Sequence, residues 1–316
     1  MTGATILSGF LGSGKTTLVN RLLSRPAGPR YAVLVNEFGD VGIDGQLIVA
    51  SEDEVVELAN GCVCCTIRGD LERGLVDLLE RRNRLLRKAR FDGVLIEGSG
   101  LASPGPIAQT LAVVPALAEG YELNGIVTLA HAGRIAEQLE GFPEAREQVG
   151  LADWLVLNHT DGLEAAALNG ARSALRKRNG AARLFETSHA DLDLALLENE
   201  LASLGLELGA HVEHSHQTDV VTASFSSDEA LDIHRLKMWL QFLSSRPDGQ
   251  ILRIKGIVRC AGHTNALTVQ GVYQLLEFGP SETQAPECSQ LVVIGQDFDP
   301  TELERGWQAC SSSAGL

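Results

Sequence analysis

The segment that decides the fold is Gly9-Phe10-Leu11-Gly12-Ser13-Gly14-Lys15-Thr16, which matches the P-loop pattern G-x4-G-K-[ST]. It follows an apolar run at residues 5–8 and opens a helical pattern at residues 15–23. In this setting the glycines let backbone N–H groups turn toward a phosphate, and the start of the helix adds a positive dipole. We expect Lys15 to bridge the β- and γ-phosphates and Thr16 to bind Mg²⁺, with Ser13 and Thr17 also at the nucleotide. A glycine-rich turn that binds nothing is the alternative.

Other short apolar runs extend this pattern into a parallel sheet. They lie at residues 31–36, 93–96, 125–129, 154–157 and 183–186, with helical stretches between them. Such alternation is typical of βαβ units, and continuous apolar runs are typical of strands covered on both faces. The fold class predicted is therefore α/β, a P-loop NTPase parallel sheet with helices on both faces.

A carboxylate ends the run Val94-Leu95-Ile96-Glu97, and Gly98-Ser99-Gly100 follows it. A strand-end acid is where a P-loop protein holds Mg²⁺, and a glycine two or three residues later can offer its backbone amide to the γ-phosphate. We expect Glu97 and Gly100 to take these parts. A solvated carboxylate without a role is the other interpretation.

The segment Asn158-His159-Thr160-Asp161 follows the run at residues 154–157 and resembles the guanine-binding pattern Asn-Lys-x-Asp. The Asp161 carboxylate could accept hydrogen bonds from guanine N1–H and the 2-amino group, which adenine lacks. His159 replaces the usual lysine and can still lie on the face of the base. Ser188 and His189, after residues 183–186, are candidates to close the pocket. An ordinary Asn–Asp turn is the alternative.

Three cysteines lie close together in Gly61-Cys62-Val63-Cys64-Cys65. Thiolates favour zinc and other soft or borderline transition metals, and three of them leave one tetrahedral position open. Our candidate for the fourth ligand is Glu37, which follows the apolar run at residues 31–36. A redox thiol switch and three buried, inert cysteines are the competing readings.

Composition restricts the setting and the partners. The 316 residues carry a formal net charge of −15, and 44% of them are hydrophobic. The negative charge argues against nucleic acid and anionic membranes as partners. The sequence shows no secretory n-region and no apolar run near the ~20 residues of a membrane span. We therefore expect a cytoplasmic globular protein; oligomeric state stays open.

The organisation changes after residue 205. We expect a P-loop GTPase domain at residues 1–205, a linker at 206–219 and a smaller α+β domain at 220–316. The second domain has strand patterns at 220–225, 251–260, 267–272, 273–278 and 291–294, and helices at 228–244 and 300–309. Strands joined by turns favour an antiparallel sheet. His131, His234 and His263 stand alone in the sequence and are assigned no role.

Together these motifs resemble the CobW-like family of P-loop GTPase metallochaperones. The resemblance rests on GFLGSGKTT from residue 9, NEFGDVGIDGQLI from residue 36, NGCVCCTIRGDL from residue 60 and IEGSGLASPGPI from residue 96, and it continues in ILRIKGIVRCAG from residue 251. It covers nearly the whole chain. His159 departs from the family's usual lysine.

The resemblance implies a slow GTPase that carries zinc or another transition metal to a client metalloprotein. It assigns Lys15, Thr16 and Glu97 to phosphate and Mg²⁺, and Asn158 with Asp161 to guanine. It places the transported metal on Glu37, Cys62, Cys64 and Cys65. A redox-responsive nucleotidase and an ATP-dependent phosphotransferase are the other functions considered, and the motifs supply no glutamine to orient the attacking water.

Overall fold

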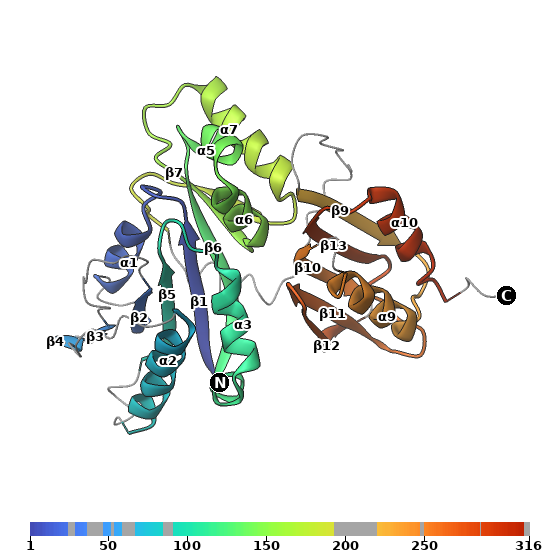
Figure 1. Cartoon of the computed structure of the whole chain (residues 1–316), viewed down its shortest axis with the longest axis horizontal. Helices are drawn as coiled ribbons and strands as arrows, with labels where there is room; N and C mark the ends of the chain where they lie inside the picture. Colours follow the sequence, from blue (N-terminus) through green and yellow to red (C-terminus); the bar gives the residue numbers. More distant parts are fainter. Residues whose placement is uncertain are drawn as a thin grey trace. The chain divides into compact units, whose positions relative to one another are not determined.

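The computed structural model describes residues 1–24, 29–36, 47–51, 54–58, 67–84, 91–192, 220–246, 250–284 and 286–312. The chain forms two compact units (Figure 1). The first comprises residues 1–175 and 182–202, and the second comprises residues 176–181 and 203–316. The expected linker, residues 206–219, lies outside the described residues, so the domain boundaries remain a prediction.

The first unit is built on an eight-stranded sheet in the order β4-β3-β2-β5-β1-β6-β7-β8. Six strands are parallel, and β3 and β4 add an antiparallel hairpin beside β2. All six predicted runs are strands of this sheet, whereas the hairpin was not predicted. The strands are β1 (Thr2–Gly9), β2 (Tyr31–Asn36), β3 (Leu47–Ser51), β4 (Glu54–Leu58), β5 (Gly93–Gly98), β6 (Tyr121–His131), β7 (Trp154–Asn158) and β8 (Arg183–Glu186).

Helices cover both faces of this sheet, as the fold class predicted. Successive side chains of a strand point to opposite faces. In β7, Trp154 and Val156 pack in a core cluster with α1, whereas Leu155 and Leu157 pack in a second cluster with α5, α6 and α7. The helices are α1 (Lys15–Leu23), α2 (Ile67–Arg84), α3 (Gly105–Val113), α4 (Pro115–Gly120), α5 (Ile135–Gly141), α6 (Pro143–Leu151) and α7 (Ala165–Arg178).

The second unit is an α+β domain with a five-stranded antiparallel sheet in the order β12-β11-β10-β13-β9. Its elements are β9 (Val220–Ser227), α9 (Ile233–Ser244), β10 (Gln250–Val258), β11 (Asn265–Val272), β12 (Leu275–Gln284), β13 (Ser289–Gln296) and α10 (Pro300–Gln308). Helix α9 begins five residues later than predicted. The Asp232 side chain caps it by accepting from the backbone N–H groups of His234 and Arg235.

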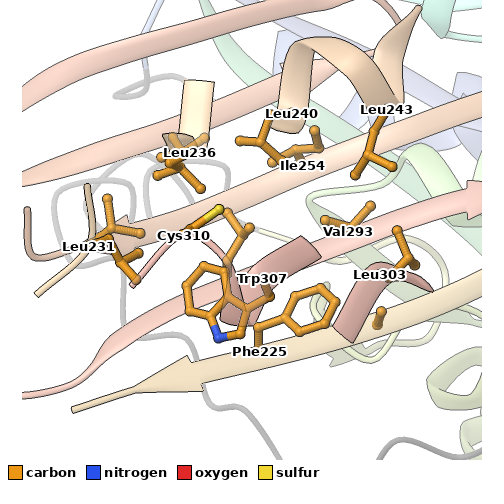
Figure 2. Packing of buried hydrophobic residues seen from close by; sticks show 14 of the residues in the cluster. Phe225, Leu231, Leu236, Leu240, Leu243, Ile254, Val293, Leu303, Trp307 and Cys310 are labelled. Carbon is orange, nitrogen blue, oxygen red and sulfur yellow. The ribbon is translucent and has the colours of Figure 1, made fainter. Parts of the chain in front are cut away.

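Side chains from α9, α10 and the sheet form the core of the second unit (Figure 2). Leu236 and Leu240 of α9 face Ile254 and Val293 of the strands, and Trp307 of α10 stacks on Phe225 with ring centroids 5.5 Å apart. All six of these labelled side chains are less than 5% exposed. This core accounts for the apolar positions that the sequence showed in residues 228–244 and 300–309.

The parallel strands of the first unit bring their carboxyl ends to one edge of the sheet. In the register, Leu7 lies beside Glu97, and Leu157 lies beside Glu186. The loops after β1, β5, β6, β7 and β8 therefore leave the sheet at the same edge, where ligands of open α/β sheets bind. In the described part of the chain, no helix has the length and apolar character needed to cross a bilayer.

A candidate nucleotide-binding site at the carboxyl edge of the sheet

Glycines shape the loop between β1 and α1. Gly9, Gly12 and Gly14 have φ angles of 141°, 75° and 106°, a region that side chains disfavour. At two of these positions a side chain would also clash with neighbouring atoms. A Cβ at Gly9 would lie 2.3 Å from the Leu129 carbonyl oxygen, and one at Gly14 would lie 2.4 Å from Asn158 Nδ2. The loop can take this shape only with glycine at these positions.

The Lys15 side chain folds back into this loop. It is 8% exposed, and its Nζ donates a 2.7 Å hydrogen bond to the carbonyl oxygen of Gly9. Burial lowers the pKa of Lys15 from its usual range, and the nearby Glu97 carboxylate acts in the opposite direction. The ammonium group is thus held beside the loop whose backbone would surround a phosphate.

Thr16 and Glu97 meet across the gap between α1 and the end of β5. Thr16 Oγ1 donates to Glu97 Oε1 at 2.8 Å, and Glu97 is only 6% exposed. A hydroxyl and a carboxylate are oxygen ligands of the kind that Mg²⁺ prefers. The two groups therefore fit a magnesium ion bound at this point, directly or through water.

The loop that follows β5 lies against the P-loop. Gly100 is buried, and a Cβ there would lie 2.4 Å from Leu11 Cδ2 and 3.0 Å from Leu11 Cα. On its other side the loop is bound to α6, because Gln148 Nε2 donates to the carbonyl oxygens of Gly100 and Ala102 at 3.1 and 3.0 Å. The backbone of residues 100–102 is held between the P-loop and α6.

Asn158 joins three loops of the site. It is fully buried, its Nδ2 donates to the Ser13 carbonyl at 2.9 Å, and its Oδ1 accepts from the Ala190 N–H at 2.8 Å. One amide thus connects the P-loop, the end of β7 and the loop after β8. The sequence placed Asn158 at a base-binding position, and the geometry adds this bracing of the loops.

Asp161 lies close to the loop after β8, as the sequence suggested. Thr160 Oγ1 donates to the Thr187 carbonyl and lies 3.1 Å from Ser188 Oγ. A backbone hydrogen bond at Asp161, and then one from the Ser188 side chain, lower the pKa of Asp161. Its exposed carboxylate therefore stays ionised at neutral pH and can accept hydrogen bonds from a base. His189 is exposed on the same loop.

His159 stacks on His131, a residue to which the sequence assigned no role. Their ring centroids are 4.4 Å apart with an interplanar angle of 21°. His159 has a φ of 60°, and His131 Nδ1 accepts from the Gly133 N–H at 3.2 Å. Burial, and then the neighbouring His159 and Arg134, lower the pKa of His131. The stack joins the ends of β6 and β7, because His131 is the last residue of β6 and His159 directly follows β7.

The predicted transition-metal ligands Glu37, Cys62, Cys64 and Cys65 lie outside the described residues. Asn36 is the last described residue before Glu37, and it pairs with Gly98 at the edge of the sheet where Glu97 lies. Within the described ranges, no group of three or more His, Cys, Asp or Glu residues could hold a metal ion.

The three cysteines of the second unit have thiols with raised pKa values. Cys260 and Cys310 are buried, which raises the pKa of Cys260 to about 11 and that of Cys310 to about 12. Burial, and then Asp228, also raise the pKa of Cys288. Metals bind the thiolate form, which these three thiols disfavour at neutral pH. The cysteines in residues 62–65 stay the candidates that the sequence predicted.

The fold and the loop geometry define a P-loop nucleotide-binding protein. Comparison with known families makes this more specific: residues 3–186 match the CobW/HypB/UreG nucleotide-binding domain, and residues 220–311 match the cobalamin synthesis protein cobW C-terminal domain. The chain belongs to the CobW family.

Two curated relatives are similar to nearly the whole chain. The zinc chaperone YjiA of Escherichia coli (strain K12) is 35% identical over 308 residues, which is 95% of each chain. The zinc chaperone CobW of Pseudomonas aeruginosa is 33% identical over 341 residues, covering 95% of this chain and 88% of the relative. The zinc-regulated GTPase metalloprotein activator 1 of Schizosaccharomyces pombe is 37% identical over 67% of this chain and 52% of its own.

Solved structures agree with the fold. The crystal structure of the Zn(II)-bound YjiA GTPase from E. coli superimposes with a TM-score of 0.76 at 31% identity, covering 98% of this chain and 99% of the other. A Zn(II)-bound triple variant of YjiA, with one glutamate and two cysteines replaced by alanine, has a TM-score of 0.72.

Sequence reasoning missed two residues that the structure brings to this site, His131 and Gln148. His131 ends β6, so strand order alone could have placed it beside the end of β7. Gln148 lies within α6 and shows no local pattern that would distinguish it from a surface glutamine.

Proposed function

We propose that this protein is a GTP-binding and slowly GTP-hydrolysing chaperone that binds zinc and delivers it to a client metalloprotein. The observation that carries the proposal is the convergence of a P-loop, a buried strand-end carboxylate and a base-binding loop at one sheet edge. Similarity over 95% of the chain to a zinc chaperone, whose crystal structure is described as a Zn(II)-bound GTPase, supports the metal.

The nucleotide roles follow from the chemistry of the groups. Lys15 and the backbone N–H groups of residues 9–17 bind the phosphates, which would draw the Lys15 ammonium away from the Gly9 carbonyl. Thr16 and Glu97 hold Mg²⁺, which neutralises charge on the phosphates when bound. Gly100 approaches the γ-phosphate by its backbone. No group in these roles takes a proton from water, which is consistent with slow turnover.

Guanine is the base that the pocket selects. An ionised Asp161 accepts from N1–H and the 2-amino group of guanine, whereas adenine offers no donor at either position. The ring of His159 lies on the base face, where the family pattern has a lysine side chain. Ser188 and His189 close the pocket from the loop after β8.

Glu37, Cys62, Cys64 and Cys65 bind the transported metal as cargo. Three thiolates and a carboxylate match the four-coordinate preference of zinc. Residues 36–66 join the end of β2 to α2, and so connect this metal site to the nucleotide edge of the sheet. A difference in metal affinity between the GTP and GDP states would then load and release the ion. We place this exchange in the cytoplasm.

Metal titration tests the proposal. The reduced protein is titrated with Co²⁺ and Zn²⁺ while GTP hydrolysis is followed, beside Cys64→Ala and, as a matched control, Cys288→Ala. The expected result is one-to-one binding with a thiolate-to-cobalt charge-transfer band and altered turnover, both lost in Cys64→Ala and retained in Cys288→Ala.

The opposite result would favour the thiol-switch function. If neither metal binds with stoichiometry while mild oxidation of the wild type reversibly changes GTP hydrolysis, the cysteines respond to redox conditions and the chaperone function is wrong. A protein that prefers ATP to GTP in the same assay would contradict the base assignment independently of the metal.

A further inference from the structure

Gln148 of α6 is a buried glutamine that borders the site and has no role in the proposed function. It is 1% exposed, and its Nε2 donates to two carbonyl oxygens, those of Gly100 and Ala102. Within the described residues, its own Oε1 accepts no hydrogen bond. A buried acceptor without a partner destabilises the folded protein. An amide at this position is therefore unfavourable unless the two hydrogen bonds that it donates have a role.

The two bonds hold the loop on both sides of Leu101, which is 50% exposed. Gly100 sits against Leu11 of the P-loop, where even a Cβ would clash. The loop is therefore fixed from the P-loop side by packing and from the α6 side by hydrogen bonds. Its backbone can move toward or away from the nucleotide only if one of these contacts changes.

Helix α6 is itself well anchored. The carbonyl oxygen of Gln148 accepts from Thr128 Oγ1 of β6 at 2.9 Å, which attaches the helix to the sheet. The carboxylate of Glu147 accepts from Ser103 Oγ at 2.9 Å, which adds a third hydrogen bond between α6 and the loop. At the start of the helix, Phe142 packs on Phe10 of the P-loop with ring centroids 4.7 Å apart.

We infer that Gln148, with Glu147, clamps the loop after β5 and is a positioning residue for the γ-phosphate contact of Gly100. The inference rests on the proposed function, because it assumes that GTP binds and is hydrolysed at this site. Gln148 touches no nucleotide group: it acts through the backbone of residues 100–102. Through these hydrogen bonds, a contact between Gly100 and the γ-phosphate is transmitted to α6, whereas GDP, which lacks that phosphate, makes no such contact.

If Gln148 had only a packing role, its replacement would have a different effect on nucleotide binding. If Gln148 only filled space, a side chain of similar length and shape would replace it, or its loss would weaken GTP and GDP binding alike. The clamp predicts that an isosteric side chain without a donor harms only the state that uses Gly100, because the other phosphates are bound by the P-loop.

The test compares Gln148→Met with Gln138→Met. Gln138 of α5 is a matched control, since it is 7% exposed and its Oε1 also has no partner among the described residues. For each variant, kcat and KM for GTP are measured, and affinities for GDP and a non-hydrolysable GTP analogue are found by competition with a fluorescent nucleotide. Circular dichroism confirms folding.

For Gln148→Met we expect kcat and the affinity for the GTP analogue to fall about tenfold, as the loss of two hydrogen bonds would produce, with GDP affinity within about twofold. Gln138→Met should stay within about twofold in all measurements. The inference is overturned if folded Gln148→Met keeps the wild-type ratio of analogue to GDP affinity.

If Gln148→Met does not fold, Ser103→Ala tests the clamp through the hydrogen bond between Ser103 and Glu147. It should lower analogue affinity selectively but less strongly, and an unchanged ratio would overturn the inference. Failure of the proposed function looks different, because the wild type itself would then show no GTP hydrolysis and no preference between guanine and adenine nucleotides.

Discussion

Asp161 is the single side chain on which the proposed selectivity for guanine depends. Its position in the pattern after β7 predicted a guanine-binding carboxylate, and the structure adds hydrogen bonds that lower its pKa. The replacement of lysine by His159 weakened the pattern. The sequence analysis assigned no role to His131, which ends a different strand and stacks on His159.

Changing Asp161 to asparagine should alter which base is bound. An amide donates where the carboxylate accepted, so it would oppose the 2-amino group of guanine and suit the C2 carbonyl of xanthine. We expect GDP affinity to fall at least about tenfold and XDP affinity to rise. Competition with a fluorescent nucleotide measures the affinities for GDP and XDP. Asp191→Asn, which replaces another exposed carboxylate, is the control. Equal losses for the two nucleotides would contradict the assignment.

The stack of His131 on His159 predicts coupling between the two residues. His131→Ala should weaken GDP binding about threefold to tenfold in the parent protein, because the ring that supports His159 is lost. In a protein that already carries His159→Lys, His131→Ala should lower GDP affinity by less than about twofold. A double-mutant cycle measures the coupling. Additive effects would mean that His131 does not act through His159, and His234→Ala is the control.

Among the secondary-structure elements, the sequence was most reliable where pattern and chemistry agreed. The P-loop with its strand and helix, the other parallel strands and the antiparallel second sheet were predicted from short patterns. The β3–β4 hairpin was missed because its two strands are only five residues long, which is too short for a clear periodic signal. Helix α9 was predicted too long because its cap, Asp232, lies inside an otherwise helical pattern.

The loops at the sheet edge depend on one another through Asn158. Asn158→Ala would leave the buried Ser13 carbonyl and Ala190 N–H unpaired. We expect a loss of about 2–5 kcal/mol in the free energy of unfolding, together with weak nucleotide binding. Urea denaturation with and without GDP measures both the stability and the nucleotide binding. The control is Asn169→Ala, at an exposed position of α7. A variant of wild-type stability would show that the bonds do not brace the loops.

In the whole molecule, the two units have separate cores. The candidate nucleotide residues belong to the first unit, and the described cysteines belong to the second, with pKa values raised by burial. The assignment of the transported metal to residues 62–65 stays a prediction from the sequence. Sequence alone identified that cluster by its soft donors, and the linker and metal residues fall outside the described part of the structure.

Separate cores predict separate responses to core mutations. Leu240→Ala, at a fully buried position in α9, should destabilise the second unit by about 2–5 kcal/mol. The exposed neighbour Met238→Ala should change little. Differential scanning calorimetry should show one transition shifted in Leu240→Ala, with GDP affinity unchanged. Loss of GDP binding in this variant would contradict independent folding of the first unit.

In the proposed function, nucleotide state controls metal affinity. The most direct measurement is the Zn²⁺ affinity of the wild-type protein, by competition with a chelating dye, in the presence of GDP and of a non-hydrolysable GTP analogue. We expect the two Zn²⁺ affinities to differ by about tenfold or more, since a coupling of about 1–3 kcal/mol, or about 5- to 150-fold, is typical of linked sites. Equal affinities in the two nucleotide states would contradict it.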